Sequence, residues 1–187
     1  MTMTTTEATP AIAKERQTSL GLYVTAKEAY DMWQADPDSV KILDVRTPEE
    51  FVFTGHAPMA WNIPFAFLAY EWSEEKNGFP WGLNEGFVSA VEERFAPGDT
   101  ILVSCRSGGR AAMAINQLAT SGFTHAYNIL DGMEGSRVSD PDSVFDGMRM
   151  KNGWKNSGLP WTYDLDPEHM VLPERESGTP HPGNEHD

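Results

Sequence analysis

Cysteine, positive charge and long apolar runs are all scarce in this chain of 187 residues. Cys105 is the only cysteine, so no disulfide can form within the chain. The 14 Lys and Arg side chains are outnumbered by 28 Asp and Glu side chains, and the net charge of −14 argues against nucleic acid or an anionic membrane surface as a partner. No apolar run approaches the roughly 18 residues of a membrane span, and the polar start has no apolar core of the kind a secretion signal needs. These absences predict a cytoplasmic protein without a membrane partner.

The chain divides by composition into three parts. Residues 1–18 are Thr-rich, polar and without periodicity, which predicts a disordered N-terminal segment. Residues 19–165 are numerous enough to bury a sizeable core and are predicted to form one domain. Residues 166–187 are predicted to be a C-terminal extension that is largely disordered. Its histidines, His181 and His186, are too sparse for a metal site, and we expect neither a metal nor another cofactor.

Short apolar runs alternate with segments of helical spacing through the predicted domain. Two of the helices have clear start signals, because Thr25 and Thr47 are each followed three residues later by a glutamate, Glu28 and Glu50. Strands are predicted at residues 22–24, 40–45, 60–63, 101–103 and 124–129. This alternation is typical of an α/β fold in which a parallel sheet carries helices on both faces.

The most informative stretch is the loop Cys105-Arg-Ser-Gly-Gly-Arg110, which joins a buried strand to a helix predicted over 110–120. Loops at the carboxyl ends of parallel strands are where such folds bind their ligands. Gly108 and Gly109 allow positive φ angles that turn backbone N–H groups inward, and the helix start adds unpaired N–H groups. Together with the charges of Arg106 and Arg110, these groups favour a thiolate and an anion in front of it. We therefore predict Cys105 as a nucleophile, with residues 106–110, Ser107 included, as its anion receptor.

Two other interpretations of this loop are weaker. A lone cysteine is most often a small buried apolar residue, but such a residue gains nothing from two neighbouring guanidinium groups. A nucleotide-binding loop would end in Gly-Lys-Ser or Gly-Lys-Thr, which this stretch does not.

Polar residues at the neighbouring strand end are secondary candidates. Asp44 ends the strand predicted over 40–45, and two roles are open for it: an ion pair with a loop arginine that supports the site, or a purely structural ion pair. Arg46 is expected to pair with Glu50 across one helical turn. His56 is interpreted as a residue that fixes a turn rather than as a base for Cys105.

The same residues resemble a known family. The loop Cys105-Arg-Ser-Gly-Gly-Arg110 is similar to the active-site loop of the rhodanese (thiosulfate sulfurtransferase) superfamily. Residues 42–51 and 55–64 resemble two further signatures of that family, and residues 121–133 and 153–160 resemble its closing elements. The resemblance implies a single rhodanese-like domain with about five core strands. It also implies a persulfide on Cys105 as the catalytic intermediate, with the loop arginines holding the sulfur donor.

The function this implies is a thiosulfate sulfurtransferase. A small anionic donor such as thiosulfate would give its outer sulfur to Cys105, and cyanide, a thiol or a protein would accept it. With no second cysteine to resolve the persulfide, the acceptor has to come from outside the chain. The oligomeric state is left open.

Two alternatives belong to other functional classes. The first is a non-catalytic sulfur carrier or interaction module. The second is a cysteine phosphatase or arsenate reductase; related phosphatases have a longer loop and a His before the Cys, whereas four residues separate Cys105 from Arg110 here and Ser104 precedes the cysteine.

Two further segments depart from a minimal domain. Residues 136–152 interrupt the predicted closing helix; their apolar side chains predict packing, either over Cys105 or against an acceptor, although a surface excursion without a role is equally compatible. Residues 65–84 are unusually aromatic, and burial in the core is the first expectation for them. For Phe79 and Trp81, a pocket wall or a dimer contact is a second hypothesis.

Overall fold

A computed structural model describes residues 11–172 of the chain. The termini, residues 1–10 and 173–187, lie outside this range, and with them His181 and His186. Within residues 11–172 no helix is long and apolar enough to cross a membrane.

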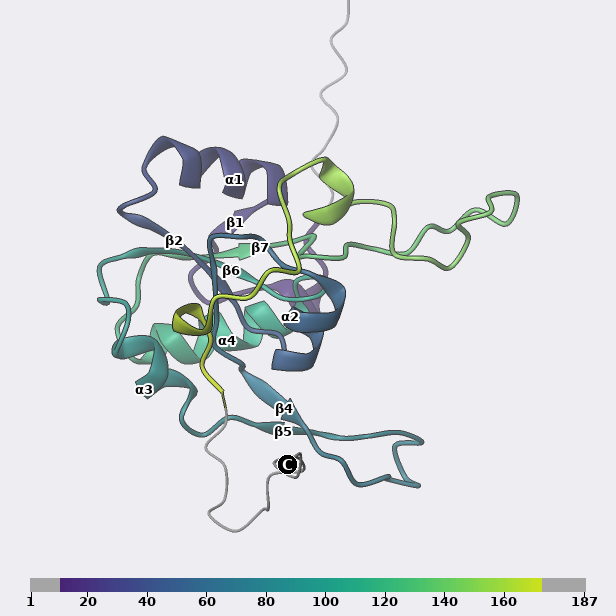
Figure 1. The fold of residues 1–187 in the computed structure, drawn as a ribbon, viewed down its shortest axis with the longest axis horizontal. Helices are drawn as coiled ribbons and strands as arrows, with labels where there is room; N and C mark the ends of the chain where they lie inside the picture. Colours follow the sequence, from purple (N-terminus) through teal and green to yellow (C-terminus); the bar gives the residue numbers. More distant parts are fainter. Residues whose placement is uncertain (1–10, 173–187) are drawn as a thin grey trace, which may run out of the picture.

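The centre of the molecule is a five-stranded parallel sheet with the strand order β1-β7-β6-β2-β3. It is built from β1 (Tyr23–Val24), β2 (Val40–Asp44), β3 (Ala60–Asn62), β6 (Thr100–Ser104) and β7 (Ala126–Ile129). Figure 1 shows α1 (Ala26–Ala35) on one side of this sheet and α3 (Phe87–Glu92) and α4 (Gly109–Thr120) on the other. The predicted α/β class, with about five parallel strands and helices on both faces, is confirmed.

Each face of the sheet has its own apolar core. The core under α3 and α4 contains Val91, Ile115 and Leu118. The opposite core contains Ala29 of α1 and Phe51 of α2 (Pro48–Thr54). Both predicted capping boxes are present, since the side chains of Thr25 and Thr47 accept hydrogen bonds from the N–H groups three residues later.

Strand pairing decides where the functional loop lies. β2 and β6 pair in register over their whole length, from Val40 opposite Thr100 to Asp44 opposite Ser104. The two strands therefore end at the same edge of the sheet, and the residue that follows β6 is Cys105.

Asp44 does not pair with a loop arginine. Its carboxylate binds Arg46, with Nη2–Oδ2 and Nε–Oδ1 distances of 2.7 and 2.9 Å, and both side chains are almost fully buried. Arg46 also donates to the carbonyl of Gly55 and the hydroxyl of Thr54. Asp44 is thus a structural residue, and the expected pair between Arg46 and Glu50 is wrong because the guanidinium turns back to the strand end.

The folded part extends beyond the predicted boundaries on both sides. Residues 11–18 include the 3-10 helix η1 (Lys14–Arg16), and Arg16 donates to the carbonyl of Leu130. Residues 166–172 include η3 (Pro167–His169), after which the N–H of Val171 binds the carbonyl of Asn62 in β3. The predicted disorder is therefore wrong for these two stretches.

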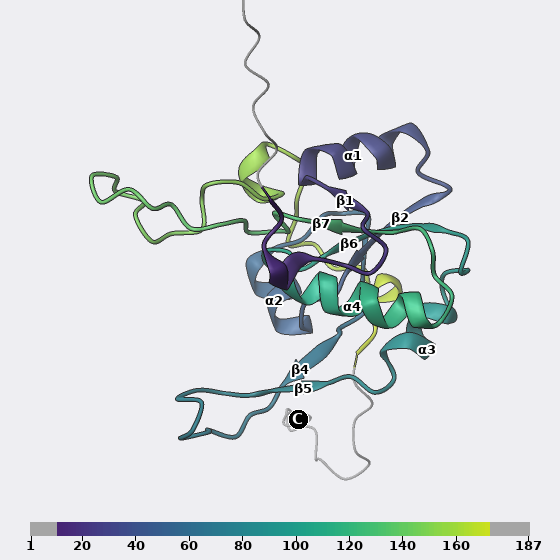
Figure 2. The ribbon, with the colours of Figure 1, turned by 180° about the vertical axis from the view of Figure 1, so that it is seen from behind.

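Two segments project from the body, and Figures 1 and 2 show both of them on the same side of the molecule. One is the antiparallel hairpin of β4 (Ala66–Leu68) and β5 (Trp81–Leu83). The other is an arm made of residues 136–152, held internally by bonds such as that from the N–H of Val138 to the carbonyl of Met148 (2.8 Å). A 3-10 helix, η2 (Lys155–Ser157), follows the arm.

Most apolar side chains of these projections stay in solvent. In the hairpin segment Phe65 is buried, but Tyr70, Trp72, Phe79 and Trp81 are exposed, so the expectation of a buried aromatic segment is largely wrong. In the arm, Val144 is 87% exposed, and Phe145, Met148 and Met150 are also exposed. Neither segment has a second layer on its outer side, which is why the expected packing is missing.

The buried pair Asp44–Arg46 gives a test of the fold. Arg46→Leu leaves the carboxylate of Asp44 buried without its guanidinium, and we expect a loss of about 3–5 kcal/mol in the free energy of unfolding. Arg94→Leu is the control, because it removes the partner of Glu93 in a more exposed pair and should cost about 0–1 kcal/mol. Chemical denaturation measures both, and equal losses in the two variants would contradict this account.

Candidate active site

Cys105 occupies the first position after β6, in a loop that ends where α4 begins at Gly109. Its side chain is 2% exposed, and its sulfur accepts a hydrogen bond from the N–H of Gly108 at 3.2 Å. Gly108 has a φ of +93°, and a Cβ at this position would lie 2.6 Å from the carbonyl oxygen of Leu130. The backbone that turns an N–H toward the thiol therefore requires glycine here.

The turn after β7 holds this loop from outside. The N–H groups of Met133 and Glu134 donate to the carbonyls of Cys105 (2.8 Å) and Arg106 (3.0 Å). A Cβ on Gly132 would lie 2.5 Å from the carbonyl oxygen of Cys105. On the other side, the amide of Asn128 donates to the carbonyl of Gly108 at 3.1 Å. These contacts fix the outward-facing carbonyls of the loop.

None of these supporting residues was predicted from the sequence. Gly132 lies within residues 121–133, and nothing in the composition of that stretch indicates which loop it packs against. The one usable signal was Asn128, an amide inside a predicted strand, because buried amides need hydrogen-bond partners.

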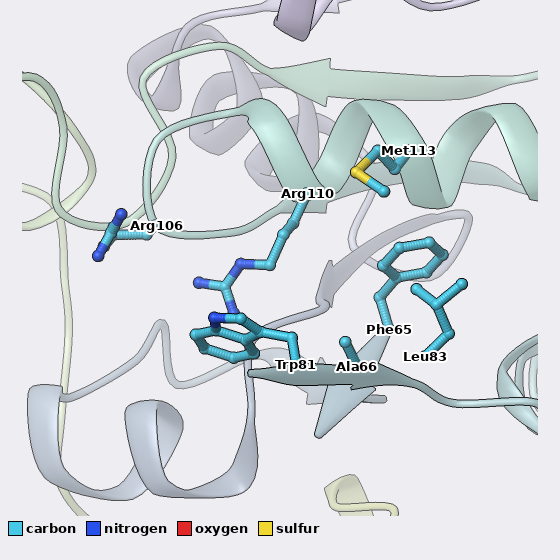
Figure 3. A pocket seen from close by; sticks show the side chains of 7 residues that line it. All are labelled: Phe65, Ala66, Trp81, Leu83, Arg106, Arg110 and Met113. Atoms are coloured by element: carbon cyan, nitrogen blue, oxygen red, sulfur yellow. The ribbon is translucent and has the colours of Figure 1, made fainter. Parts of the chain in front are cut away.

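Arg110 is held from two directions. Its Nη1 and Nη2 atoms lie 2.5 and 2.6 Å from the two carboxylate oxygens of Glu50, a bidentate pair in which both side chains are 19% exposed. Its guanidinium also lies over the ring of Trp81, 4.7 Å from the centroid. Figure 3 shows Arg110 extending from α4 onto Trp81 of β5. Glu50 therefore links α2 to the Cys105 loop, which is one of the two roles that the sequence left open for Asp44.

This pair changes the titration of both partners. Burial raises the pKa of Glu50, but the hydrogen bonds and charge of Arg110 outweigh it and hold that pKa below its usual value. Burial alone lowers the pKa of Arg110, yet the hydrogen bonds to Glu50 and the negative charge of Glu50 raise it. Arg110 remains a cation, and Glu50 is its paired anion.

Arg106 has a different environment. Its side chain is exposed, and within residues 11–172 no carboxylate lies within 4.0 Å of it. Positive charge gathers nearby: after burial, the charges of Arg106 and Arg137 are the main causes that lower the pKa of Arg149, at the base of the arm. The loop of this acidic protein thus lies in a locally positive region.

The remaining loop residues complete the receptor. Ser107 and Gly109 are half-buried between Arg106 and Arg110. His56 lies elsewhere: its ring stacks on Phe51 with centroids 3.7 Å apart, and its Nδ1 is 3.2 Å from the carbonyl oxygen of Phe51. Burial lowers the pKa of His56, and this placement agrees with the turn-fixing role rather than with a base.

A cavity of about 340 Å³ opens beside the loop. Figure 3 shows the side chains that line it: Phe65, Ala66, Trp81, Leu83, Arg106, Arg110 and Met113. The pocket-wall hypothesis is therefore correct for Trp81, whereas Phe79 instead packs edge-to-face on Trp72. No residue of the arm lines this cavity. Among the residues that the structure describes, no group of three His, Cys, Asp or Glu side chains is placed to hold a metal ion.

Comparison with known proteins gives a consistent result. The family model described as "Rhodanese-like domain" matches residues 25–137. Thiosulfate sulfurtransferase 16, chloroplastic, of Arabidopsis thaliana is 37% identical over 92 residues, which are 49% of this chain and 69% of that protein. An uncharacterized protein of Rickettsia conorii is 28% identical over 140 residues, covering 75% of this chain and 96% of that one.

Solved structures show the same fold. The crystal structure of Rv0390 from M. tuberculosis superposes with a TM-score of 0.57 at 26% identity, over 75% of this chain and 96% of that one. The solution structure of a rhodanese-like domain from Anabaena sp. has a TM-score of 0.51 at 16% identity, over 88% of this chain and 96% of that one.

The contact at Gly132 can be tested without an activity assay. Gly132→Ala adds a Cβ that collides with the Cys105 carbonyl at a φ of +60°, so we expect a loss of about 1–3 kcal/mol in unfolding free energy. Amide exchange at Met133 and Glu134 should also quicken. Gly122→Ala is the matched control, since Gly122 has a φ of +93° but no atom within 4 Å of the added Cβ. Unchanged exchange in Gly132→Ala would show that the turn does not hold the loop.

The pair of Glu50 and Arg110 predicts a pH-dependent stability difference. Because the folded pKa of Glu50 is lowered, the pair stabilises the fold above the usual glutamate pKa of about 4.3 and loses that effect as pH falls through the lowered value. Glu50→Gln keeps an amide able to serve the capping box, so it should cost about 1.5–3 kcal/mol at pH 7 and progressively less below pH 4.3.

Glu28→Gln is the matched control for that experiment. Glu28 serves the corresponding capping box in α1, and within residues 11–172 its carboxylate bonds only to the backbone and side chain of Thr25. Denaturation midpoints across pH 7 to 3.5 should show a small loss for this variant. A loss as large as that of Glu50→Gln would assign the effect to the capping box.

Proposed function

The chain belongs to the rhodanese-like domain family, and on this premise we propose that it is a sulfurtransferase that carries a sulfane sulfur as a persulfide on Cys105. The observation that carries the proposal is the placement of the single cysteine. Its sulfur lies at the carboxyl edge of a parallel sheet, accepts an N–H from Gly108, and has two arginines on its loop. A nucleophile beside an anion receptor suits attack on an anionic sulfur donor.

The first half-reaction loads the enzyme. The Cys105 thiolate attacks the outer sulfur of thiosulfate, a new S–S bond forms, and the S–S bond of the donor breaks. Sulfite leaves with the electron pair of that bond. Arg106 is the cation best placed to stabilise it, because the charge of Arg110 is already matched by Glu50. The N–H of Gly108 then donates to the sulfur of the loop.

The second half-reaction unloads it. A thiolate or cyanide attacks the outer sulfur of the persulfide, and Cys105 leaves as a thiolate. Since the chain has no other cysteine, the acceptor is an external molecule. The scheme needs no metal, no cofactor and no change in the total number of electrons. The donor and acceptor occupy the loop in turn, so the kinetics are ping-pong.

The loop argues against a phosphatase, because only four residues separate Cys105 from Arg110 and Ser104 stands where related phosphatases have a His. A non-catalytic sulfur carrier shares the loaded state with the enzyme and differs only in the rate of unloading. Location in the cytoplasm remains a proposal that rests on composition.

Intact mass spectrometry tests the proposal directly. After treatment with thiosulfate, the wild-type protein should gain the mass of one sulfur atom, and cyanide should remove it with formation of thiocyanate. Cys105→Ser removes the nucleophile and should show neither gain nor turnover. Initial rates with both substrates varied should give parallel lines in a double-reciprocal plot.

Three results separate the alternatives. A wild-type protein that gains no cyanide-removable sulfur contradicts the persulfide. Loading without steady-state turnover favours a carrier. Hydrolysis of an aryl phosphate that is lost in Cys105→Ser favours a phosphatase.

A further inference from the structure

The cavity beside the Cys105 loop, which Arg106 and Arg110 of that loop line, is larger than an inorganic donor needs. Thiosulfate has five non-hydrogen atoms, whereas the cavity of about 340 Å³ has room for roughly ten water molecules at about 30 Å³ each. Cavities from about 300 Å³ upward are those in which proteins bind organic ligands. The cavity is thus larger than the binding of thiosulfate at the loop requires.

The lining of the cavity is also divided by polarity. Arg106 and Arg110 lie next to Cys105, whereas the rest of the lining is apolar and comes from the hairpin, the segment before it and Met113 of α4. Figure 3 shows Met113, Phe65 and Leu83 grouped at one end and Arg106 at the other, with Arg110 and Trp81 between them. A ligand that fits this lining carries negative charge at one end and an apolar group at the other.

Three of the apolar side chains that line the cavity lie outside both cores. Trp81, Leu83 and Met113 are 48%, 65% and 53% exposed, so none of them belongs to either core. Trp81 and Leu83 lie on β5 and Met113 lies on α4, one turn after Arg110. Large apolar side chains that face a cavity from two separate elements are typical of a ligand site rather than of scattered surface residues.

We propose that this cavity binds the organic group of a sulfur substrate, namely an anion whose sulfur-bearing head carries an aryl or branched alkyl body. The head lies at Cys105 and the arginines, and the body lies between Trp81, Leu83 and Met113. Trp81 is the residue that determines specificity for the body. This inference rests on the proposed sulfur transfer and adds the class of substrate to it.

Two kinds of substrate share this chemistry, and the reaction of each balances in atoms and electrons. In the donor role, an organic thiosulfonate gives its outer sulfur to the Cys105 thiolate; the S–S bond to Cys105 forms, the S–S bond of the donor breaks, and a sulfinate leaves with the electron pair. In the acceptor role, an aryl or alkyl thiolate attacks the outer sulfur of the persulfide and leaves as an organic persulfide. Neither reaction needs an oxidant or a reductant.

The donor role is tested by the ratio of kcat/KM for benzenethiosulfonate to kcat/KM for thiosulfate, with cyanide as the acceptor. In a ping-pong scheme each kcat/KM reports the loading step alone. Trp81→Ala should lower this ratio by about tenfold, since it removes apolar contacts that only the organic donor makes. Leu83→Ser should lower it in the same direction without touching the contact between Trp81 and Arg110.

Trp72→Ala is the matched control. Trp72 lies in the same hairpin segment and is 51% exposed, but it does not line the cavity. Its substitution should leave the ratio at the wild-type value. A fall in both kcat/KM values by the same factor in Trp81→Ala, with no effect of Leu83→Ser, would show that Trp81 only holds Arg110, and would overturn the proposal.

The acceptor role is tested in a second experiment. With thiosulfate as the fixed donor, kcat/KM for thiophenol is compared with kcat/KM for cyanide in the same three variants. A reduced ratio in this second experiment alone assigns the cavity to the acceptor, and a reduced ratio in the first experiment alone assigns it to the donor. Unchanged ratios in both experiments overturn the inference while leaving the proposed sulfur transfer intact. Failure of the wild type to load sulfur from either donor is a failure of the proposed function itself.

Discussion

The site depends on where the carbonyl groups of the Cys105 loop find their partners. Those of Cys105 and Arg106 bind N–H groups of the turn after β7, and that of Gly108 binds the amide of Asn128. With the carbonyls fixed outward, the N–H of Gly108 points to the sulfur. The close approach is possible only because Gly132 and Gly108 have no Cβ, so a reactive thiol is held by backbone packing rather than by a neighbouring acid or base.

The charge near this loop differs in sign from the net charge of the chain. The chain as a whole carries a net charge of −14, yet Arg106, Arg137 and Arg149 are near enough to one another to influence the titration of Arg149. Within this region Glu50 matches Arg110, which leaves Arg106 as the more available cation. Fields of this kind act over distances below the Debye length, about 10 Å at 0.1 M salt, so the arginines near the loop act locally and the net charge of the distant surface is largely screened there.

The sheet and the position of the Cys105 loop between β6 and α4 were predictable because they depend on local signals. The alternation of strands and helices, the two capping boxes and the sequence Cys105-Arg-Ser-Gly-Gly-Arg110 are each readable within a few residues. What depends on three-dimensional placement was missed. Glu50 was expected to pair with Arg46 but pairs with Arg110, and of the two roles open for Asp44 the structural pair, with Arg46, is present, because side-chain pairing is not encoded in spacing. The aromatic hairpin and the arm were expected to pack, but composition does not tell whether a second layer covers a segment.

The hairpin that forms one wall of the cavity is held by fewer contacts than the Cys105 loop. Two-stranded ribbons are marginal on their own, and this hairpin is tied to the body by a few contacts, among them Trp81 on Arg110 and the bond between Tyr70 and Glu49. Segments with so little buried surface open at a small fraction of the free energy of global unfolding. The Cys105 loop is held by hydrogen bonds to its backbone carbonyls, whereas the outer part of the hairpin is exposed. We therefore expect the hairpin wall of the cavity to open more readily than the loop, which would let the cavity accept bodies of different shape at one sulfur position.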